Sequence, residues 1–139
     1  MKQIETNGTA LHVAETGPAD APPVVFLHAL GVDLRVWDGI VARMPPGLRL
    51  VRIDMRGHGL SDCPPAPYAM GALVTDTEGA MDALGLRDAV VVGLSIGGMI
   101  AQRLAVKRLD LVRGLVLSNT AARIGTPEIW AERMAAARD

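Results

Sequence analysis

The segment VVVGLSIGGM, residues 90–99, decides the fold. It runs from three β-branched residues through G-L-S-I-G (residues 93–97) into a stretch with helical periodicity. A G-x-S-x-G motif between a strand and a helix is typical of a sharp turn that exposes a serine at the carboxyl end of a sheet. Both glycines are expected where neighbouring backbone lies too close for a Cβ atom. Ser95 is therefore the candidate nucleophile, and the Ile96 N–H, at a helix N-terminus, is a candidate oxyanion donor.

Phosphate binding is the competing interpretation of this turn, because a glycine-rich connection between strand and helix can cradle a phosphate group. The segment contains neither G-x-G-x-x-G nor the lysine of a P-loop, which disfavours that interpretation. The net charge of −1 likewise predicts no nucleic-acid partner and no attraction to an anionic membrane.

The rest of the chain alternates predicted strands and helices. A hairpin is expected around Asn7-Gly8, which would add two antiparallel strands at one edge. Apolar strands that alternate with helices indicate an α/β protein with a mostly parallel sheet covered by helices on both faces. Ligands of such sheets bind beyond the carboxyl ends of the strands. The predicted strands are 24–28, 48–54, 88–95 and 112–119. Helices are predicted at 33–44, at 70–85 and at 126–139, the last with Thr126 as its N-cap. A further helix is predicted after Ser95, with Ile96, Met99, Ile100 and Leu104 on one face.

Composition places the chain among single-domain proteins. Its 139 residues are 50% hydrophobic but only 3% aromatic, so the core is expected to be aliphatic. The single cysteine, Cys63, excludes an internal disulfide and is compatible with a reducing compartment. The N-terminus shows no apolar leader, and no apolar run is long enough to span a bilayer. A soluble cytoplasmic protein without membrane contact is expected.

Two further segments are expected to lie beside the serine. LHALG (residues 27–31) follows a strand, and the Leu30 N–H is the candidate second oxyanion donor, although an ordinary strand-to-loop turn would have the same pattern. DMRGHGLS (residues 54–61) follows the next strand. Its glycines and Arg56 indicate a tight loop held by a charge-assisted hydrogen bond, and His58 is interpreted as structural rather than catalytic.

These motifs, in this order, resemble the α/β-hydrolase fold. LHALGVDLRVW, DMRGHGLSD and GLSIGGMIAQ are shared by many hydrolases, whereas SNTAARIGTPEIW after the last strand is similar to one branch, the 3-oxoadipate enol-lactonases. The resemblance covers essentially the whole chain. It implies opening of 3-oxoadipate enol-lactone to 3-oxoadipate in aromatic degradation through the β-ketoadipate pathway. Ser95 would attack the lactone, the Ile96 and Leu30 amides would hold the oxyanion, and a histidine oriented by an aspartate would act as the base, without a metal or organic cofactor.

The histidine that this mechanism needs is not found after the serine. The triad order in this fold is Ser, then Asp or Glu, then His. All three histidines precede Ser95. His12 is expected at the surface or edge of the hairpin, and His28 is expected to hydrogen-bond the loop that carries Leu30.

The carboxylates after the serine do not match the triad either. Asp110 precedes the last predicted strand, at the wrong end of the sheet, and Asp139 is the last residue. In the family, a helical cap follows that strand, and later strands supply the Asp and the His. We therefore expect residues 1–122 to form the N-terminal part of an α/β-hydrolase core and residues 123–139 the start of the cap. The C-terminal strands and most of the cap would be absent, and a second polypeptide or C-terminal fragment would complete the fold.

A carboxylate-bearing lactone would need a cation near the cap. Arg123, Arg133 and Trp130 are the candidate substrate-binding residues. The simpler interpretation is that Trp130 packs the cap helix and both arginines are solvated.

Three interpretations of function remain open. The chain is part of an enol-lactonase completed by another polypeptide, or it belongs to another α/β-hydrolase branch, such as the carboxylesterases or the cofactor-free haloperoxidase-like enzymes. In the third interpretation it is a non-catalytic truncated domain that acts as an assembly module. The strand at 112–119 would then leave an open apolar sheet edge for self-association.

Overall fold

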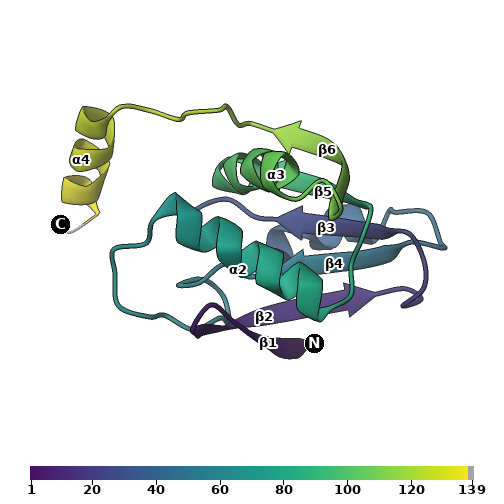
Figure 1. The fold of residues 1–139 in the computed structure, drawn as a ribbon. Coiled ribbons are helices and arrows are strands. Elements are labelled where there is room, and N and C mark those ends of the chain that lie inside the picture. Colours follow the sequence, from purple (N-terminus) through teal and green to yellow (C-terminus); the bar gives the residue numbers. More distant parts are fainter. Residues whose placement is uncertain (138–139) are drawn as a thin grey trace.

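The computed structural model describes residues 1–137, so the predicted end of the last helix and Asp139 lie outside the described residues. Within them, six strands form one sheet in the order β1-β2-β4-β3-β5-β6 (Figure 1). None of the described helices is both long and apolar enough to cross a bilayer. The strands are β1 (Lys2–Thr6), β2 (Thr9–Thr16), β3 (Pro23–Leu27), β4 (Arg49–Ile53), β5 (Ala89–Leu94) and β6 (Val112–Ser118), and the helices are η1 (Leu34–Trp37), α1 (Asp38–Val41), α2 (Met70–Ala83), α3 (Ile96–Lys107) and α4 (Pro127–Ala136).

The sheet is antiparallel at one edge and parallel elsewhere. β1 and β2 form the predicted hairpin, in which Asn7 and Gly8 both have positive φ (46° and 70°), as a two-residue turn of this kind requires. β2 also pairs antiparallel with β4, whereas β4, β3, β5 and β6 run parallel. The carboxyl ends of the parallel strands therefore meet at one edge, as the strand–helix alternation predicts.

Helices cover both faces, which confirms the predicted α/β architecture. α2 and α3 lie on one face and bury the larger aliphatic core, which includes Met81 and Ile100. The short η1 and α1 segments lie on the other face, over a smaller core in which the rings of Phe26 and Trp37 are 5.3 Å apart.

The predicted helix at 33–44 is wrong in length and in type. Its first turn is the 3₁₀ helix η1, and only the four residues of α1 are α-helical. The Asp33 carboxylate accepts the Arg35 N–H at 2.9 Å, which favours the tight first turn. At the other end, Arg43 and Met44 donate to carbonyls three residues earlier, and Pro45 disfavours helical backbone at Met44. Capping and proline therefore shorten a segment whose apolar periodicity alone predicts three turns.

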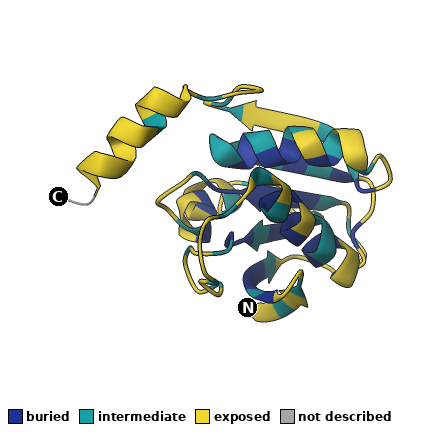
Figure 2. Ribbon diagram, turned by 60° about the vertical axis from the view of Figure 1, so that its left-hand side comes forward, coloured by how far each residue is buried: buried dark blue, intermediate teal, exposed yellow. Residues whose placement is uncertain are grey.

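α4 and β6 contain no buried residue among those described (Figure 2). Thr126 caps α4 as predicted, accepting the Ile129 N–H at 3.4 Å, but none of its described side chains is buried. β6 is the last strand of the sheet and pairs with β5 alone, which confirms the predicted open edge. Its apolar side chains stay solvent-exposed, with 50% of Val116 accessible.

α3 approaches β3 and β5 so closely that backbone touches backbone. A Cβ on Gly93 would lie 2.5 Å from the Gly97 carbonyl oxygen, and a Cβ on Gly97 would lie 2.6 Å from the Leu27 carbonyl carbon. Real Cβ atoms do not approach backbone this closely, so both positions require glycine. The predicted reason for the two motif glycines is confirmed.

Gly97→Ala should therefore lower the free energy of unfolding by about 3 kcal/mol, because the atoms that the methyl group meets are backbone and cannot rotate away. Urea denaturation followed by circular dichroism measures the change. Gly114→Ala in β6 is the matched control, since a Cβ there meets no atom within 4 Å, and its effect should stay within about 0.5 kcal/mol. Equal midpoints for the two variants would contradict this account of the turn.

Candidate active site

Ser95 occupies a strained turn between β5 and α3. Its φ of 53° and ψ of −116° are costly for a residue with a side chain, and such strain persists only where the surroundings impose it. The Ser95 N–H donates to the Ser118 carbonyl at 3.0 Å. Its carbonyl accepts from the Gly98 N–H at 3.0 Å and from the Thr120 hydroxyl at 2.6 Å. Contacts to the end of β6 thus hold the serine backbone in place.

A pocket of about 250 Å³ opens beside this serine. It brings together residues from the loop after β3, the start of α2, the turn itself and α4. Four predicted site residues are among them, although their roles remain predictions. The described lining residues are Leu30, Met70, Ser95, Ile96, Met99, Ile124 and Trp130.

Met99 corrects one detail of the predicted packing. It was expected on the core face of α3 with Ile100 and Leu104, but it is half-buried and lines the pocket. The core face of α3 is instead completed by Gly97, Gly98 and Ala101, because the helix lies too close to the sheet at its first turn for a larger side chain.

Two backbone N–H groups are available at the pocket. Ile96 is the first residue of α3, so its N–H has no acceptor within the helix and lies at the positive end of the helix dipole. Leu30 follows the end of β3, and its N–H makes no hydrogen bond to any residue in the described part of the chain. Both residues line the pocket, and the oxyanion role of their N–H groups remains a prediction.

Trp130 is held firmly, whereas the two predicted arginines are solvent-exposed. The Trp130 indole N–H donates to the Ile124 carbonyl at 2.8 Å. The Arg133 guanidinium lies 5.2 Å from the centre of the indole ring, close enough for a cation–π contact. Arg123 and Arg133 are not among the lining residues, and every described lining residue is uncharged. Trp130 therefore has the packing role of the simpler interpretation and also lines the pocket.

Two histidines link the loops after β3 and β4, and their partners define their protonation. His28 is fully buried, as 0% of it is accessible. Its Nδ1 lies 2.8 Å from the Ala29 carbonyl and must donate, and its Nε2 accepts the Met55 N–H at 3.0 Å. The ring is thus neutral, which agrees with burial lowering its pKa below the usual value, partly offset by the Ala29 hydrogen bond. The predicted loop-bonding role of His28 is confirmed.

His58, in the loop after β4, has the same pattern of hydrogen bonds as His28: one ring nitrogen bonds a carbonyl and the other accepts a backbone N–H. Its Nδ1 donates to the Arg56 carbonyl at 3.1 Å, and its Nε2 accepts the Gly31 N–H at 3.2 Å. The His28 and His58 rings are 5.1 Å apart. In both rings the Nε2 lone pair is taken, so neither is free to accept a proton from Ser95.

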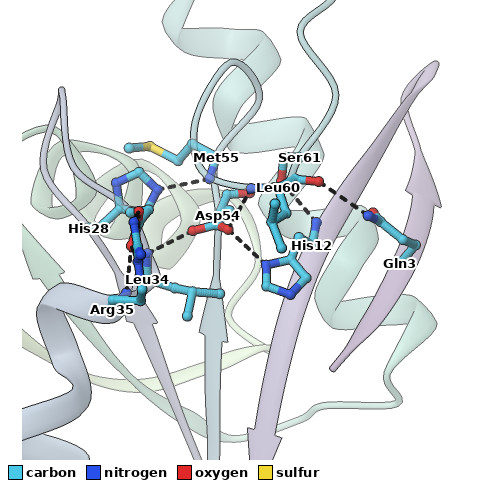
Figure 3. A network of polar contacts seen from close by, with 10 residues as sticks. Gln3, His12, His28, Leu34, Arg35, Asp54, Met55, Leu60 and Ser61 are labelled. Carbon is cyan, nitrogen blue, oxygen red and sulfur yellow. Dashed lines mark hydrogen bonds and ion pairs between the residues drawn. The ribbon is translucent and has the colours of Figure 1, made fainter.

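Asp54, which the sequence did not single out by itself, lies at the centre of a buried polar network (Figure 3). It is 1% exposed and accepts the Leu34 N–H at 2.7 Å, the Leu60 N–H at 3.1 Å and His12 Nδ1 at 2.8 Å. A carboxylate at the end of a buried strand needs such partners. Its position directly after β4, at the carboxyl end of a buried strand, was the signal in the sequence that could have identified it.

His12 therefore corrects another expectation. It was expected at the surface or edge of the hairpin, but it is 6% exposed. The antiparallel pairing of β2 with β4 places it beside Asp54, a contact between residues far apart in the sequence. Its Nε2 is buried and has no partner among the described residues. The residue lines a different cavity, of about 440 Å³.

Arg56 has the predicted structural role. Its guanidinium makes two hydrogen bonds to the nearly buried Asp76 carboxylate, at 2.5 and 2.6 Å, and these bonds raise the pKa of Arg56. Asn7 in the hairpin turn donates to the same carboxylate at 2.8 Å. The pair ties the 54–61 loop to α2.

No acid–base partner for Ser95 is found among residues 1–137. The Ser95 hydroxyl makes no hydrogen bond there. Both ring nitrogens of His28 and of His58 are hydrogen-bonded, and His12 lines a different cavity from Ser95. Asp110 lies just before the start of β6, whereas Ser95 contacts the end of that strand. The hydrogen bond from Arg108 also lowers the pKa of Asp110 to about 2. The described residues also contain no cluster of His, Cys, Asp and Glu suited to a metal ion.

The sheet, the strained serine turn and the two loops at its edge define a class. The chain belongs to the α/β-hydrolase fold family, whose family model matches residues 22–137. Within it, the chain is 34% identical over 136 residues to 3-oxoadipate enol-lactonase 2 of Acinetobacter baylyi, covering 98% of this chain and 51% of that protein.

Solved structures and other curated proteins agree with this placement. The crystal structure of the enol-lactonase from Burkholderia xenovorans LB400 superposes with a TM-score of 0.92 at 40% identity, over 99% of this chain and 54% of that one. A non-heme chloroperoxidase of Streptomyces lividans is 36% identical over 94 residues, or 67% of this chain and 34% of that protein. The chain spans about half the length of the enol-lactonases that it matches.

The free energy of unfolding should fall as the pH is lowered from 8 to 5. Because the folded state lowers the His28 pKa, the unfolded chain binds more protons once the pH falls to the usual value of about 6.5, and this favours unfolding. Urea denaturation across this range measures the slope. His28→Asn, which cannot be protonated, should be less stable at pH 8 but show a flatter dependence. Parallel curves for the variant and the wild type would show that His28 does not supply the effect.

Proposed function

We propose that this chain carries the nucleophile and oxyanion hole of a carboxylic-ester or lactone hydrolase of the enol-lactonase type. The proposed reaction opens 3-oxoadipate enol-lactone to 3-oxoadipate in aromatic degradation, and the expected cytoplasmic location belongs to the same proposal. The observation that carries it is the pocket in which Ser95 meets Leu30, Ile96 and Trp130. Similarity to enol-lactonases at 34% and 40% identity supports the substrate class.

In the proposed reaction, the Ser95 oxygen attacks the lactone carbonyl while its proton passes to an imidazole base. The Ile96 and Leu30 N–H groups stabilise the oxyanion of the tetrahedral intermediate. Collapse breaks the ring C–O bond, and the enol oxygen leaves with the proton from the imidazolium. Water, activated by the same imidazole, then hydrolyses the acyl-serine and regenerates the hydroxyl, and the enol tautomerises to the ketone of 3-oxoadipate. No metal or organic cofactor takes part.

The imidazole and its orienting carboxylate are proposed to come from polypeptide outside these 139 residues, either a C-terminal continuation or a second chain. Two observations support this: both ring nitrogens of His28 and of His58 are hydrogen-bonded, and His12 lines a different cavity from Ser95. The edge of β6 offers unpaired backbone groups and exposed Leu115, Val116 and Leu117 for a further strand to cover. We propose residues 123–139 as the start of the cap over the pocket.

The substrate carboxylate is proposed to bind near Arg133. Its guanidinium lies 5.2 Å from the centre of the Trp130 ring, so Arg133 is a cation in contact with a residue that lines the pocket. Arg123, on the segment between β6 and α4, is the second candidate. A neutral ester would make no use of either charge.

A related α/β-hydrolase activity is the second candidate function. The described lining of the pocket is apolar apart from Ser95, which suits a neutral ester, and the similarity to a non-heme chloroperoxidase is in keeping with it. Comparison of kcat/KM for the enol-lactone and for p-nitrophenyl acetate separates the two. Arg133→Gln should weaken only the reaction of the carboxylate-bearing lactone.

Assembly without catalysis is the third candidate, favoured by the exposed apolar residues of β6. Light scattering of the purified chain and of a Val116→Lys variant tests it, because a charge on this strand should block edge-to-edge pairing. Concentration-dependent self-association that the lysine abolishes would support the assembly function, and a monomeric wild-type chain would exclude it.

Ser95→Ala should lower kcat for lactone opening by about 10⁴- to 10⁶-fold in an assembly that contains the missing imidazole. The assembly is first identified by intact-mass spectrometry of the purified protein, and steady-state assays then compare the variants. Ser118→Ala is the matched control, because this serine lies at the same edge of the sheet and its hydroxyl bonds only Asn119 among the described residues.

Labelling with a fluorophosphonate gives a second readout of the same serine. The probe should modify Ser95 rapidly in the assembly and slowly in the isolated chain, because an unassisted hydroxyl is a poor nucleophile. Full lactonase activity in Ser95→Ala would overturn the proposed function.

A further inference from the structure

The loop that carries Leu30 is poorly held by its own packing. It leaves the sheet after Leu27, and Gly31 has a φ of 78°, a conformation that few other residues adopt. The Leu30 side chain is 55% exposed, so burial does not anchor it. An oxyanion donor must be fixed before the reaction, because a misplaced N–H stabilises the transition state poorly. Within the loop, His28 Nδ1 bonds the Ala29 carbonyl, which belongs to the same peptide as the Leu30 N–H. The peptide on the other side of Leu30 needs an anchor from outside the loop.

The 54–61 segment supplies three anchors to this loop. The Met55 N–H donates to His28 at the start of the loop, and Asp54 accepts the Leu34 N–H at its end. Figure 3 shows both contacts. The third anchor lies between them, where His58 Nε2 accepts the Gly31 N–H at 3.2 Å. Among the contacts of residues 1–137, this last one alone reaches the peptide unit that joins Leu30 to Gly31.

The orientation of the His58 ring is itself imposed. Its Nδ1 donates to the Arg56 carbonyl, which leaves Nε2 as the acceptor that faces Gly31. Arg56 is held in turn by Asp76, and the ring packs against His28. A chain of contacts thus runs from α2 through Arg56 and His58 to the peptide beside Leu30.

We propose that His58 is a positioning residue that fixes the Leu30–Gly31 peptide and thereby aims the Leu30 N–H at the oxyanion. Its catalytic consequence rests on the proposed function, whereas its effect on the loop does not. His58 takes no proton from Ser95 and does not touch the substrate. The RGHG sequence after β4 is then more than a tight turn, because its histidine is directed at the neighbouring loop.

Nuclear magnetic resonance of the full chain tests the effect on the loop without any activity. Imidazole ¹⁵N shifts at pH 8 should show His58 protonated at Nδ1 and unprotonated at Nε2. His58→Phe should accelerate exchange of the Gly31 amide proton by at least about 10-fold. His58→Gln, whose amide oxygen can occupy the place of Nε2, should restore slow exchange. A Gly31 amide that exchanges equally slowly in His58→Phe would overturn the proposal.

Arg108→Ala controls for a general loss of stability. Arg108 pairs with Glu78, Asp82 and Asp110, well away in the chain from both loops, so its removal should destabilise the protein without selective effect on Gly31. If Arg108→Ala accelerates exchange at Gly31 as much as His58→Phe does, the effect is global unfolding and the positioning role is excluded.

Kinetics in the active assembly test the catalytic consequence. His58→Phe should lower kcat by about 10- to 100-fold with KM nearly unchanged, because the Leu30 N–H acts mainly on the transition state, and His58→Gln should recover most of kcat. An unchanged kcat in His58→Phe would overturn the catalytic part of the proposal. A wild-type assembly without any hydrolase activity would instead overturn the proposed function, and the exchange experiment would still decide whether His58 holds the loop.

Discussion

The structure depends on one close contact, the approach of the first turn of α3 to the ends of β3 and β5. Gly93 and Gly97 permit it because neither has a Cβ that would meet backbone. The approach leaves Ser95 no relaxed conformation, and its positive φ is the cost. In return, the same contact brings the N-terminus of α3 beside the loop after β3. The serine and both candidate oxyanion donors can then line one small pocket.

The second requirement is a buried polar network beneath the loop after β3, which carries Leu30. Asp54, His28 and His12 are almost fully buried, and burial of a polar group is costly unless it is hydrogen-bonded. Most of their polar atoms are paired with backbone N–H groups or with one another, and these bonds join β2, the loop after β3 and the loop after β4. The stability of the sheet edge and the geometry of the proposed oxyanion hole therefore have the same source.

The proposed chemistry links the pocket at Ser95 to the exposed elements β6 and α4. Ser95, Leu30, Ile96 and Trp130 line one pocket. His28 and His58 are committed to structural hydrogen bonds, and His12 lines a different cavity. β6 and α4 are the last two described elements of the chain, and both expose large apolar side chains. Further polypeptide that supplies the base, as proposed, would complete the triad and also cover the edge of β6. It also accords with a match to about half the length of the enol-lactonases.

The sequence by itself determined the features that depend on local backbone chemistry: the turn at Asn7-Gly8, the capped start of α4 and the glycines around Ser95. Each follows from the conformations open to a few neighbouring residues. It did not determine the burial of His12 or the pocket position of Met99. Only the tertiary structure decided these, because they depend on β2 pairing with β4 and on how closely a helix approaches the sheet. Such contacts join residues that are distant in the sequence, and no local pattern reports them.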